Sequence, residues 1–365
     1  MAGVRVPERQ HEVLEIDLPT VSDHPFPVAC RPDFPHIEKA VNEWAWRHLP
    51  TLPGVTCDRV LRLVGQAFPL WISLAYPDGS TATATRVGRW MYFWFLLDDL
   101  AGEPPEPGTD RPSPTALLDG LKGALMDPAH PAPEPFARLL QGLWSTLGPS
   151  MPPPQRARFT DSVVRMLDGF ATTIRLASAG TAITLDEYRD LRYDDSGMPW
   201  TFLLTEYCAG IDLSADIARN ARLRELLVTS VWNTALANDV IAFGKEFFAG
   251  DDWNAVSIVA REQGLSVQDA MDRVAGLARD EERRIVALCD ELAACRPGSD
   301  LHRFLQGHQR LLSGTLEWQY RSSRYHGPGY AWTGYSAGPV TVTRAGTRPH
   351  RVVPVENDVA AAFEA

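Results

Sequence analysis

The chain has 365 residues, of which 45% are hydrophobic and 22% charged, so it can bury one large core or two modest ones. Its formal net charge of −11 argues against a nucleic-acid partner or an anionic membrane surface, because both are bound through a basic face. There is no run of about 18 apolar residues and no basic N-terminal segment followed by an apolar one, so we expect a cytoplasmic protein with no membrane partner.

Helical periodicity extends over residues 34–325, where apolar side chains recur three and four positions apart. Alternating, strand-like runs are almost absent before the tail. Proline clusters at 104–114, 128–135 and 151–154 separate the periodic stretches. We expect these clusters to be loops inside one domain, because proline cannot continue a helix interior. These features predict an all-α fold.

The two ends of the chain differ from its middle. Periodicity fades after residue 326, and glycine and proline become frequent, which is typical of a loose extension. We therefore expect a flexible N-terminal segment over 1–24, one helical domain over 25–326 and a loose C-terminal tail over 327–365.

The first motif that carries chemistry ends a strongly apolar, aromatic helix. Two adjacent carboxylates, Asp98 and Asp99, are followed by Glu103. On helical spacing Trp94 and Phe95 lie on the same side as Asp98. Buried carboxylates need a partner, and a hard divalent cation is one that offsets their desolvation. The same residues also fit a solvated helix end before a proline-rich loop, so this motif alone is weak evidence for a metal site.

A second motif lies on a later helix. Asn238, Ala242 and Glu246 are spaced at i, i+4 and i+8, so they share one helix face. The Asn and Glu oxygens suit a second hard ion, and Lys245 adds a positive charge for an anionic ligand. Taken singly, a hydrogen-bonded core amide and a surface ion pair explain these residues equally well.

Together the two motifs resemble those of the bacterial class I terpene synthases. Segment 98–103 (DDLAGE) looks like their aspartate-rich motif, and segment 238–246 (NDVIAFGKE) is similar to their N-D-x-x-S-x-x-K-E motif. Arg192 stands roughly where that family places its diphosphate-sensing arginine, followed by a linker and helix-break region at 195–197. Segment 318–325 (WQYRSSRY) resembles the family's W-x-x-x-x-x-R-Y terminus. Four features in the family's order are far more specific than any one of them.

The resemblance implies a single-domain helical bundle of the class I terpenoid synthase type with a central active-site cavity. It also implies three Mg²⁺ ions, which would neutralise the diphosphate of a prenyl substrate as its carbon–oxygen bond breaks. The implied metal ligands are Asp98, Glu103, Asn238 and Glu246. The implied catalytic and diphosphate-binding groups are Asp98, Arg192, Lys245, Arg324 and Tyr325. The implied orienting carboxylates are Asp99, as the partner of Arg324, and Asp195. The implied pocket aromatics, whose faces would stabilise a carbocation, are Trp94, Phe95 and Trp318.

Two positions leave alternatives open. The family's motif serine, whose hydroxyl usually joins the second metal site, is Ala242 here, and a methyl group cannot ligate an ion. Water or diphosphate oxygens would have to complete that site, or the protein is slow or has lost activity. Tyr325 fits a hydrogen bond to diphosphate and a packing role equally well.

The function implied by the resemblance is ionisation and cyclisation of a linear prenyl diphosphate. Farnesyl diphosphate is the favoured substrate and geranylgeranyl diphosphate the second, while chain length, product skeleton and the final base are left open. One alternative is a prenyltransferase or squalene-type synthase of the same fold, which would carry a second aspartate-rich motif. Another is a catalytically degenerate helical protein that binds a hydrophobic ligand. A homodimer is compatible with either.

Overall fold

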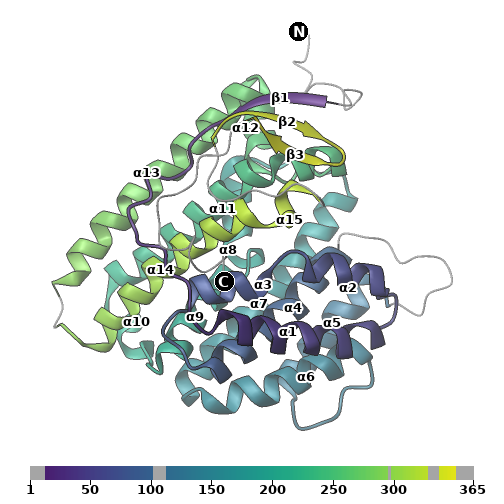
Figure 1. Cartoon of the computed structure of the whole chain (residues 1–365), viewed down its shortest axis with the longest axis vertical. Helices are drawn as coiled ribbons and strands as arrows, with labels where there is room; N and C mark the ends of the chain where they lie inside the picture. The colour runs from purple at the N-terminus through teal and green to yellow at the C-terminus, as the bar shows by residue number, and fades with distance from the viewer. Residues whose placement is uncertain (1–12, 102–111, 295–296, 328–336, 351–365) are drawn as a thin grey trace.

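The structure is a computed structural model that describes residues 13–101, 112–294, 297–327 and 337–350. Helices account for most of these residues (Figure 1), as the periodicity predicts. The helices are α1 (Phe34–His48), α2 (Cys57–Val64), α3 (Phe68–Ala75), α4 (Thr81–Ala101), α5 (Pro114–Met126), α6 (Pro135–Leu147), α7 (Pro153–Ser178), α8 (Leu185–Asp195), α9 (Met198–Ala209), α10 (Ser214–Arg219), α11 (Ala221–Ala249), α12 (Ala255–Gln263), α13 (Val267–Ala293), α14 (Asp300–Arg321) and α15 (Ser323–His326). The strands are β1 (Val13–Leu18), β2 (Gly338–Thr343) and β3 (Gly346–Pro349).

The proline clusters mark the helix boundaries. Pro114, Pro135 and Pro153 are the first residues of α5, α6 and α7. Proline is favourable there because its fixed φ suits a helix and its missing N–H has no intrahelical partner at that position. Ser113 and Glu134 cap α5 and α6 by accepting hydrogen bonds from backbone N–H groups of the first turn. The clusters thus separate helices within one bundle.

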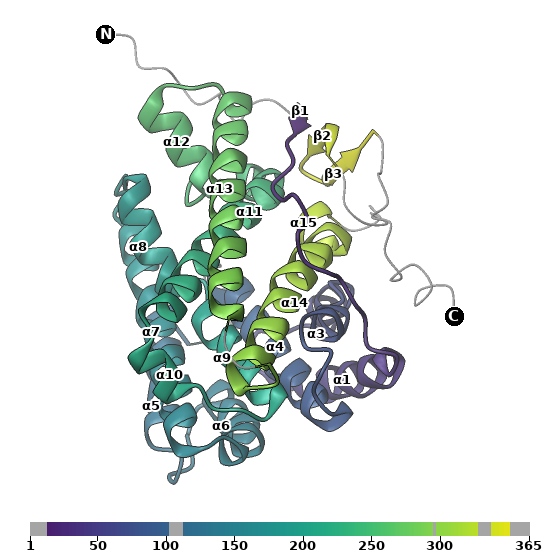
Figure 2. The same ribbon diagram turned by 90° about the vertical axis from the view of Figure 1, so that its left-hand side faces the viewer.

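Helix α11 lies at the centre of the bundle. It packs against α8, α9, α13, α14 and α15, and Figure 2 shows α13 lying across it with α14 alongside. By length and composition α11 is apolar enough to cross a membrane, but 72% of its most apolar stretch is buried inside the protein. Its apolar stretch is therefore explained by its place in the core of the bundle.

The two ends of the chain form a small antiparallel sheet that the sequence analysis did not anticipate. β1 pairs with β2, and β2 pairs with β3 (Figure 1). Val340 and Val342 of β2 are almost fully buried, and Ile16 and Leu18 of β1 are buried as well. The expected flexible start and loose tail are thus wrong for the described parts of both segments. The physical reason is that the alternating valines of β2 have an apolar surface to pack on only when the folded helices are present.

Candidate active site

Arg324 of α15 binds both carboxylates at the end of α4. Its Nη1 donates a hydrogen bond of 2.8 Å to Asp99 Oδ1, and its Nη2 donates one to Asp98 Oδ2. The arginine side chain is only 5% exposed, whereas Asp99 is 23% and Asp98 50% exposed. Burial opposes the charge of Arg324, but the carboxylates of Asp99 and Asp98 outweigh it and raise its pKa above the usual value. Asp99 thus has the partner expected from sequence, Arg324, and Asp98 binds the same arginine.

Helix α11 brings the second motif to the same place. Asn238 lies near the Tyr325 hydroxyl and favours its ionised form, but burial raises the pKa of Tyr325 to about 12 despite this and the nearby charge of Arg324. The positive charge of Arg324, followed by burial, lowers the pKa of Lys245, although the Lys245 side chain still reaches solvent. Three segments far apart in the sequence, the end of α4, the second half of α11 and α15, therefore meet around Arg324.

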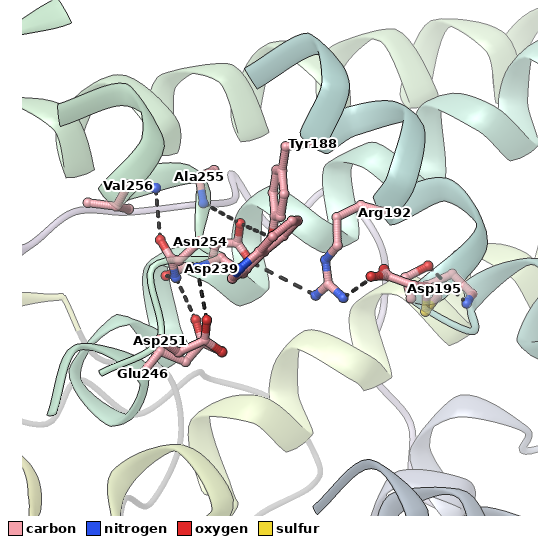
Figure 3. Close-up of polar contacts among 12 residues, drawn as sticks. Tyr188, Arg192, Asp195, Asp239, Glu246, Asp251, Asn254, Ala255 and Val256 are labelled. Carbon is pink, nitrogen blue, oxygen red and sulfur yellow. Dashed lines mark hydrogen bonds and ion pairs between the residues drawn. The ribbon is translucent and has the colours of Figure 1, made fainter. Parts of the chain in front are cut away.

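Arg192 of α8 lies between two buried carboxylates (Figure 3). Its Nη1 donates a hydrogen bond of 3.2 Å to Asp195 Oδ1, and its Nη2 lies 4.0 Å from Asp239 Oδ1. Burial works against the charged form of Arg192, but Tyr188 and these two carboxylates raise its pKa well above the usual value. Its Nε is buried and has no hydrogen-bond partner in the described part of the chain. Asp195, expected as an orienting carboxylate, is thus bonded to Arg192, and Asp239 is a second neighbour that sequence reasoning missed.

Asn254 is a further residue that sequence reasoning missed. Its side chain is fully buried, and its Nδ2 donates hydrogen bonds of 2.7 Å both to the Asp239 carbonyl oxygen and to Glu246 Oε2 (Figure 3). Its Oδ1 accepts a hydrogen bond from Val256 N and so caps α12. Burial raises the pKa of Glu246, and the charge of Lys245 and the bond from Asn254 act against that rise. An asparagine before an apolar helix is a recognisable cap, but its bond to Glu246 is a tertiary contact.

The oxygens at this site suit a hard cation. Asp98, Asn238 and Glu246 offer carboxylate and amide oxygens, and Mg²⁺ is usually held by one or two carboxylates together with substrate phosphates. Among the described residues no group of three or more His, Cys, Asp or Glu side chains could hold a metal alone. Glu103 lies outside the described residues, and Ala242 is buried and supplies no ligand. The donor set therefore fits an ion whose coordination shell is completed by a diphosphate.

Residues 89–284, more than half of the chain, match the family described as terpene synthase family 2, C-terminal metal binding. This segment contains Asp98, Arg192 and the whole 238–246 motif. The chain belongs to the terpene synthase family. It is accordingly a terpene synthase, a carbon–oxygen lyase.

Known terpene synthases resemble the chain over most of its length. A (3S,6E)-nerolidol synthase of Selaginella moellendorffii is 26% identical over 87% of this chain and 85% of its own. Sesquiterpene synthase 6 of Postia placenta is 24% identical, covering 83% and 88%. The solved structure of hedycaryol synthase in complex with nerolidol superposes with a TM-score of 0.66 at 26% identity, covering 80% of this chain and 97% of that one. These likenesses confirm the predicted class I terpenoid synthase fold, and they extend to plants and fungi.

The aromatic residues expected at the pocket of this terpene synthase fall into two clusters. Phe95 stacks on Phe68 with ring centroids 4.1 Å apart, lies 5.7 Å from Trp318, and has the Arg324 guanidinium 4.9 Å from its own ring centre. Trp94 instead packs against other tryptophans, 6.2 Å from Trp200. Of the three predicted aromatics, Phe95 and Trp318 thus lie beside the residues that meet at Arg324.

Proposed function

We propose that this terpene synthase ionises a linear prenyl diphosphate with the help of Mg²⁺ and cyclises the resulting carbocation. The observation that carries the proposal is the contact of Arg324 with both Asp98 and Asp99. This contact joins two groups in one site: a carboxylate pair, which suits metal ions, and a buried guanidinium, which suits phosphate oxygens. Asn238 and Lys245 reach the same site from α11, which provides the second set of ligands.

The proposed reaction begins with heterolysis of the bond between the first prenyl carbon and a diphosphate oxygen. The electron pair leaves with the oxygen, so the diphosphate gains negative charge and the carbon becomes an allylic cation. Bound Mg²⁺, three ions by the family resemblance, would supply Lewis-acid neutralisation of that charge. Asp98, Asn238 and Glu246 would hold it, together with Glu103.

The cationic side chains would bind the diphosphate directly. The guanidinium groups of Arg324 and Arg192 and the ammonium of Lys245 donate charge-assisted hydrogen bonds to phosphate oxygens. Asp99 and Asp195 would orient the two arginines, each through a bond already present in the structure. Tyr325 would add a hydroxyl, although its contact with Trp318 also suits packing.

Aromatic faces would protect the cation after ionisation. Phe95 lies next to Arg324, and Trp318 lies next to Phe95; both rings would stabilise positive charge through their quadrupoles without acting as strong nucleophiles. A double bond further along the prenyl chain of the substrate would then attack the cation and close a ring. Loss of a proton to the released diphosphate would end the reaction, so that no protein base is required.

Farnesyl diphosphate is the proposed substrate and geranylgeranyl diphosphate the second choice. A relative named a sesquiterpene synthase supports the C15 substrate, because sesquiterpenes have the same fifteen carbons. A cytoplasmic enzyme and a homodimer stay predictions from sequence. The rival reaction of chain elongation is disfavoured because the second motif carries Asn238 and Glu246 in place of a second aspartate-rich segment.

The test is incubation of the purified protein with geranyl, farnesyl, geranylgeranyl and geranylfarnesyl diphosphates, with Mg²⁺ or with a chelator. Products are identified by gas chromatography with mass detection. Cyclic products from farnesyl diphosphate that disappear with chelator are expected. An absence of product from every substrate would support a degenerate ligand-binding protein, with the missing hydroxyl at Ala242 as its first explanation.

A further inference from the structure

The β2–β3 hairpin packs on both elements that carry the candidate diphosphate and metal residues. It contacts α11 through both strands and contacts α15 through β3, and Figures 1 and 2 both place it beside α15. The whole hairpin lies beyond the family's terminal motif, which ends at Tyr325. The reaction described above assigns no role to it.

The contact with α11 is made at Gly244, immediately before Lys245. A methyl group added at Gly244 would lie 2.5 Å from Val342 Cγ1 and 2.7 Å from Thr347 Oγ1. Such distances are too short for any side chain, so only glycine lets the two strands approach the helix this closely. Val342 and Thr347 are 2% and 6% exposed, which shows that the strands seal the helix surface at this point.

The contact with α15 is made at Gly327, just after the helix. Gly327 has φ of +89°, and a methyl group there would lie 2.8 Å from Gly346 Cα and clash with the Ala345 carbonyl oxygen. The turn of the hairpin therefore packs directly against the backbone at Gly327. Arg344 in the same turn donates a hydrogen bond of 3.4 Å to the Phe248 carbonyl oxygen, at the end of α11.

The hairpin is itself fixed to the rest of the protein. β1 pairs with β2 along its whole length, from Val13 opposite Thr343 to Leu18 opposite Gly338. The backbone of Asp17 in β1 is bound to the Gln268 side chain of α13 by two hydrogen bonds of 2.9 and 2.7 Å. A strand from one end of the chain thus braces a hairpin from the other end against α11 and α15.

We propose that Val342 and Thr347 are positioning residues that set the separation between the C-terminal turns of α11 and the α15 helix. That separation places Lys245 and Glu246 relative to Arg324, and so fixes the diphosphate end of the site while leaving the apolar pocket unchanged. The inference rests on the proposed function, because it takes diphosphate to bind between these elements. It predicts that loosening the hairpin weakens diphosphate binding without changing which product forms.

The main test variant is Gly244→Ala, and its matched control is Gly276→Ala in α13. Both replace a helical glycine by a residue that normally favours helices, but a methyl at Gly276 meets no described atom within 4 Å. Binding of inorganic diphosphate with Mg²⁺ is measured by calorimetry, KM and kcat with farnesyl diphosphate by product formation, and folding by circular dichroism. We expect Gly244→Ala to weaken diphosphate binding and raise KM by about tenfold, since small misplacements at such sites have large effects. The product profile and the behaviour of Gly276→Ala should match the unaltered chain.

A second pair of variants keeps the test decisive if Gly244→Ala folds poorly. Val342→Ala with Thr347→Ala removes both atoms that the new methyl would meet, so we expect it to weaken diphosphate binding while the chain stays folded. Adding Gly244→Ala to that pair should then restore part of the binding, because the methyl fills the space. If Gly244→Ala and the chain with both Val342→Ala and Thr347→Ala bind diphosphate as tightly as the unaltered chain, the positioning role is overturned and the proposed function is not. If the unaltered chain binds no diphosphate, the proposed function fails with it.

Discussion

Asn254 Nδ2 and Glu246 Oε2 are joined by a hydrogen bond of 2.7 Å, so one carboxylate oxygen of Glu246 is fixed before any ligand arrives. The same amide nitrogen also binds the Asp239 carbonyl oxygen, while the amide oxygen Oδ1 of Asn254 caps α12. Glu246, the start of α12 and the backbone at Asp239 therefore share one rigid amide group. Residues that orient a metal ligand in this way commonly change metal affinity by about 10- to 100-fold when removed.

Asn254→Asp should test this role because it keeps the capping oxygen and removes both donated bonds. A carboxylate would then face the Glu246 carboxylate in a buried place. We expect the free energy of unfolding to fall by about 2–4 kcal/mol and the half-saturating Mg²⁺ concentration to rise about tenfold or more. Chemical denaturation and product formation against Mg²⁺ concentration measure the two effects. The control is Asn220→Asp at the cap of α11, where asparagine and aspartate are nearly equivalent; similar losses in both variants would contradict the role.

Asp98→Ala should abolish turnover and leave the fold intact. The side chain is half exposed, so its removal leaves little buried space, whereas the proposed site loses its principal carboxylate. We expect kcat to fall by about 10³-fold or more, the scale seen when a group that stabilises transition-state charge is removed. Helical circular dichroism checks the fold, and product formation checks activity. Asp280→Ala, at an exposed ion pair of α13, is the control, and an active Asp98→Ala variant would refute the metal assignment.

Ala242→Ser should keep activity unchanged or raise it, because it restores the hydroxyl that the related motif carries at this position. The expected signature is a lower half-saturating Mg²⁺ concentration, measured from initial rates across a metal titration. Ala237→Ser, at another buried alanine on a different face of α11, reports the cost of adding a hydroxyl to this helix. If Ala242→Ser loses most activity while Ala237→Ser does not, residue 242 does not face the metal as proposed.

His308 should make the protein less stable in mild acid. It is fully buried in α14 beside Ser230, and burial lowers its pKa to about 3, from 6.5 in an unfolded chain. Below pH 6.5 the unfolded chain therefore binds more protons than the folded one, and stability is lost as the pH falls from about 6.5 toward 3. The contribution of this one residue is about 1.4 kcal/mol per pH unit in that range.

The measurement is the free energy of unfolding at several pH values between about 6.5 and 4.5. We expect His308→Gln to reduce its dependence on pH, because the substituted side chain does not titrate. His130→Gln is the control, since His130 is exposed and bonded to Asp127, which raises its pKa instead. An unchanged slope in His308→Gln would show that this histidine is not the group responsible.

From the sequence alone one could predict the helical class, the separation of helices at the proline clusters and the two motifs proposed to carry the ligands. Helical periodicity, proline at a first turn and the i, i+4, i+8 spacing of residues 238–246 are local properties, set by 3.6 residues per turn and by backbone sterics. They can be read without knowing what any helix packs against. Asn254 shows the limit of such rules, because its place before α12 is a local property while its bond to Glu246 is a tertiary contact.

Which of these residues meet depends on the tertiary structure. Arg324 binds Asp98 across 226 positions of sequence, and β1 pairs with β2 across the whole chain. Trp94 and Phe95 are adjacent in sequence, yet they join different aromatic clusters because one helical step turns the side chain by about 100°. Such contacts depend on how the helices are stacked, which is fixed by the mutual burial of many side chains and not by any short segment.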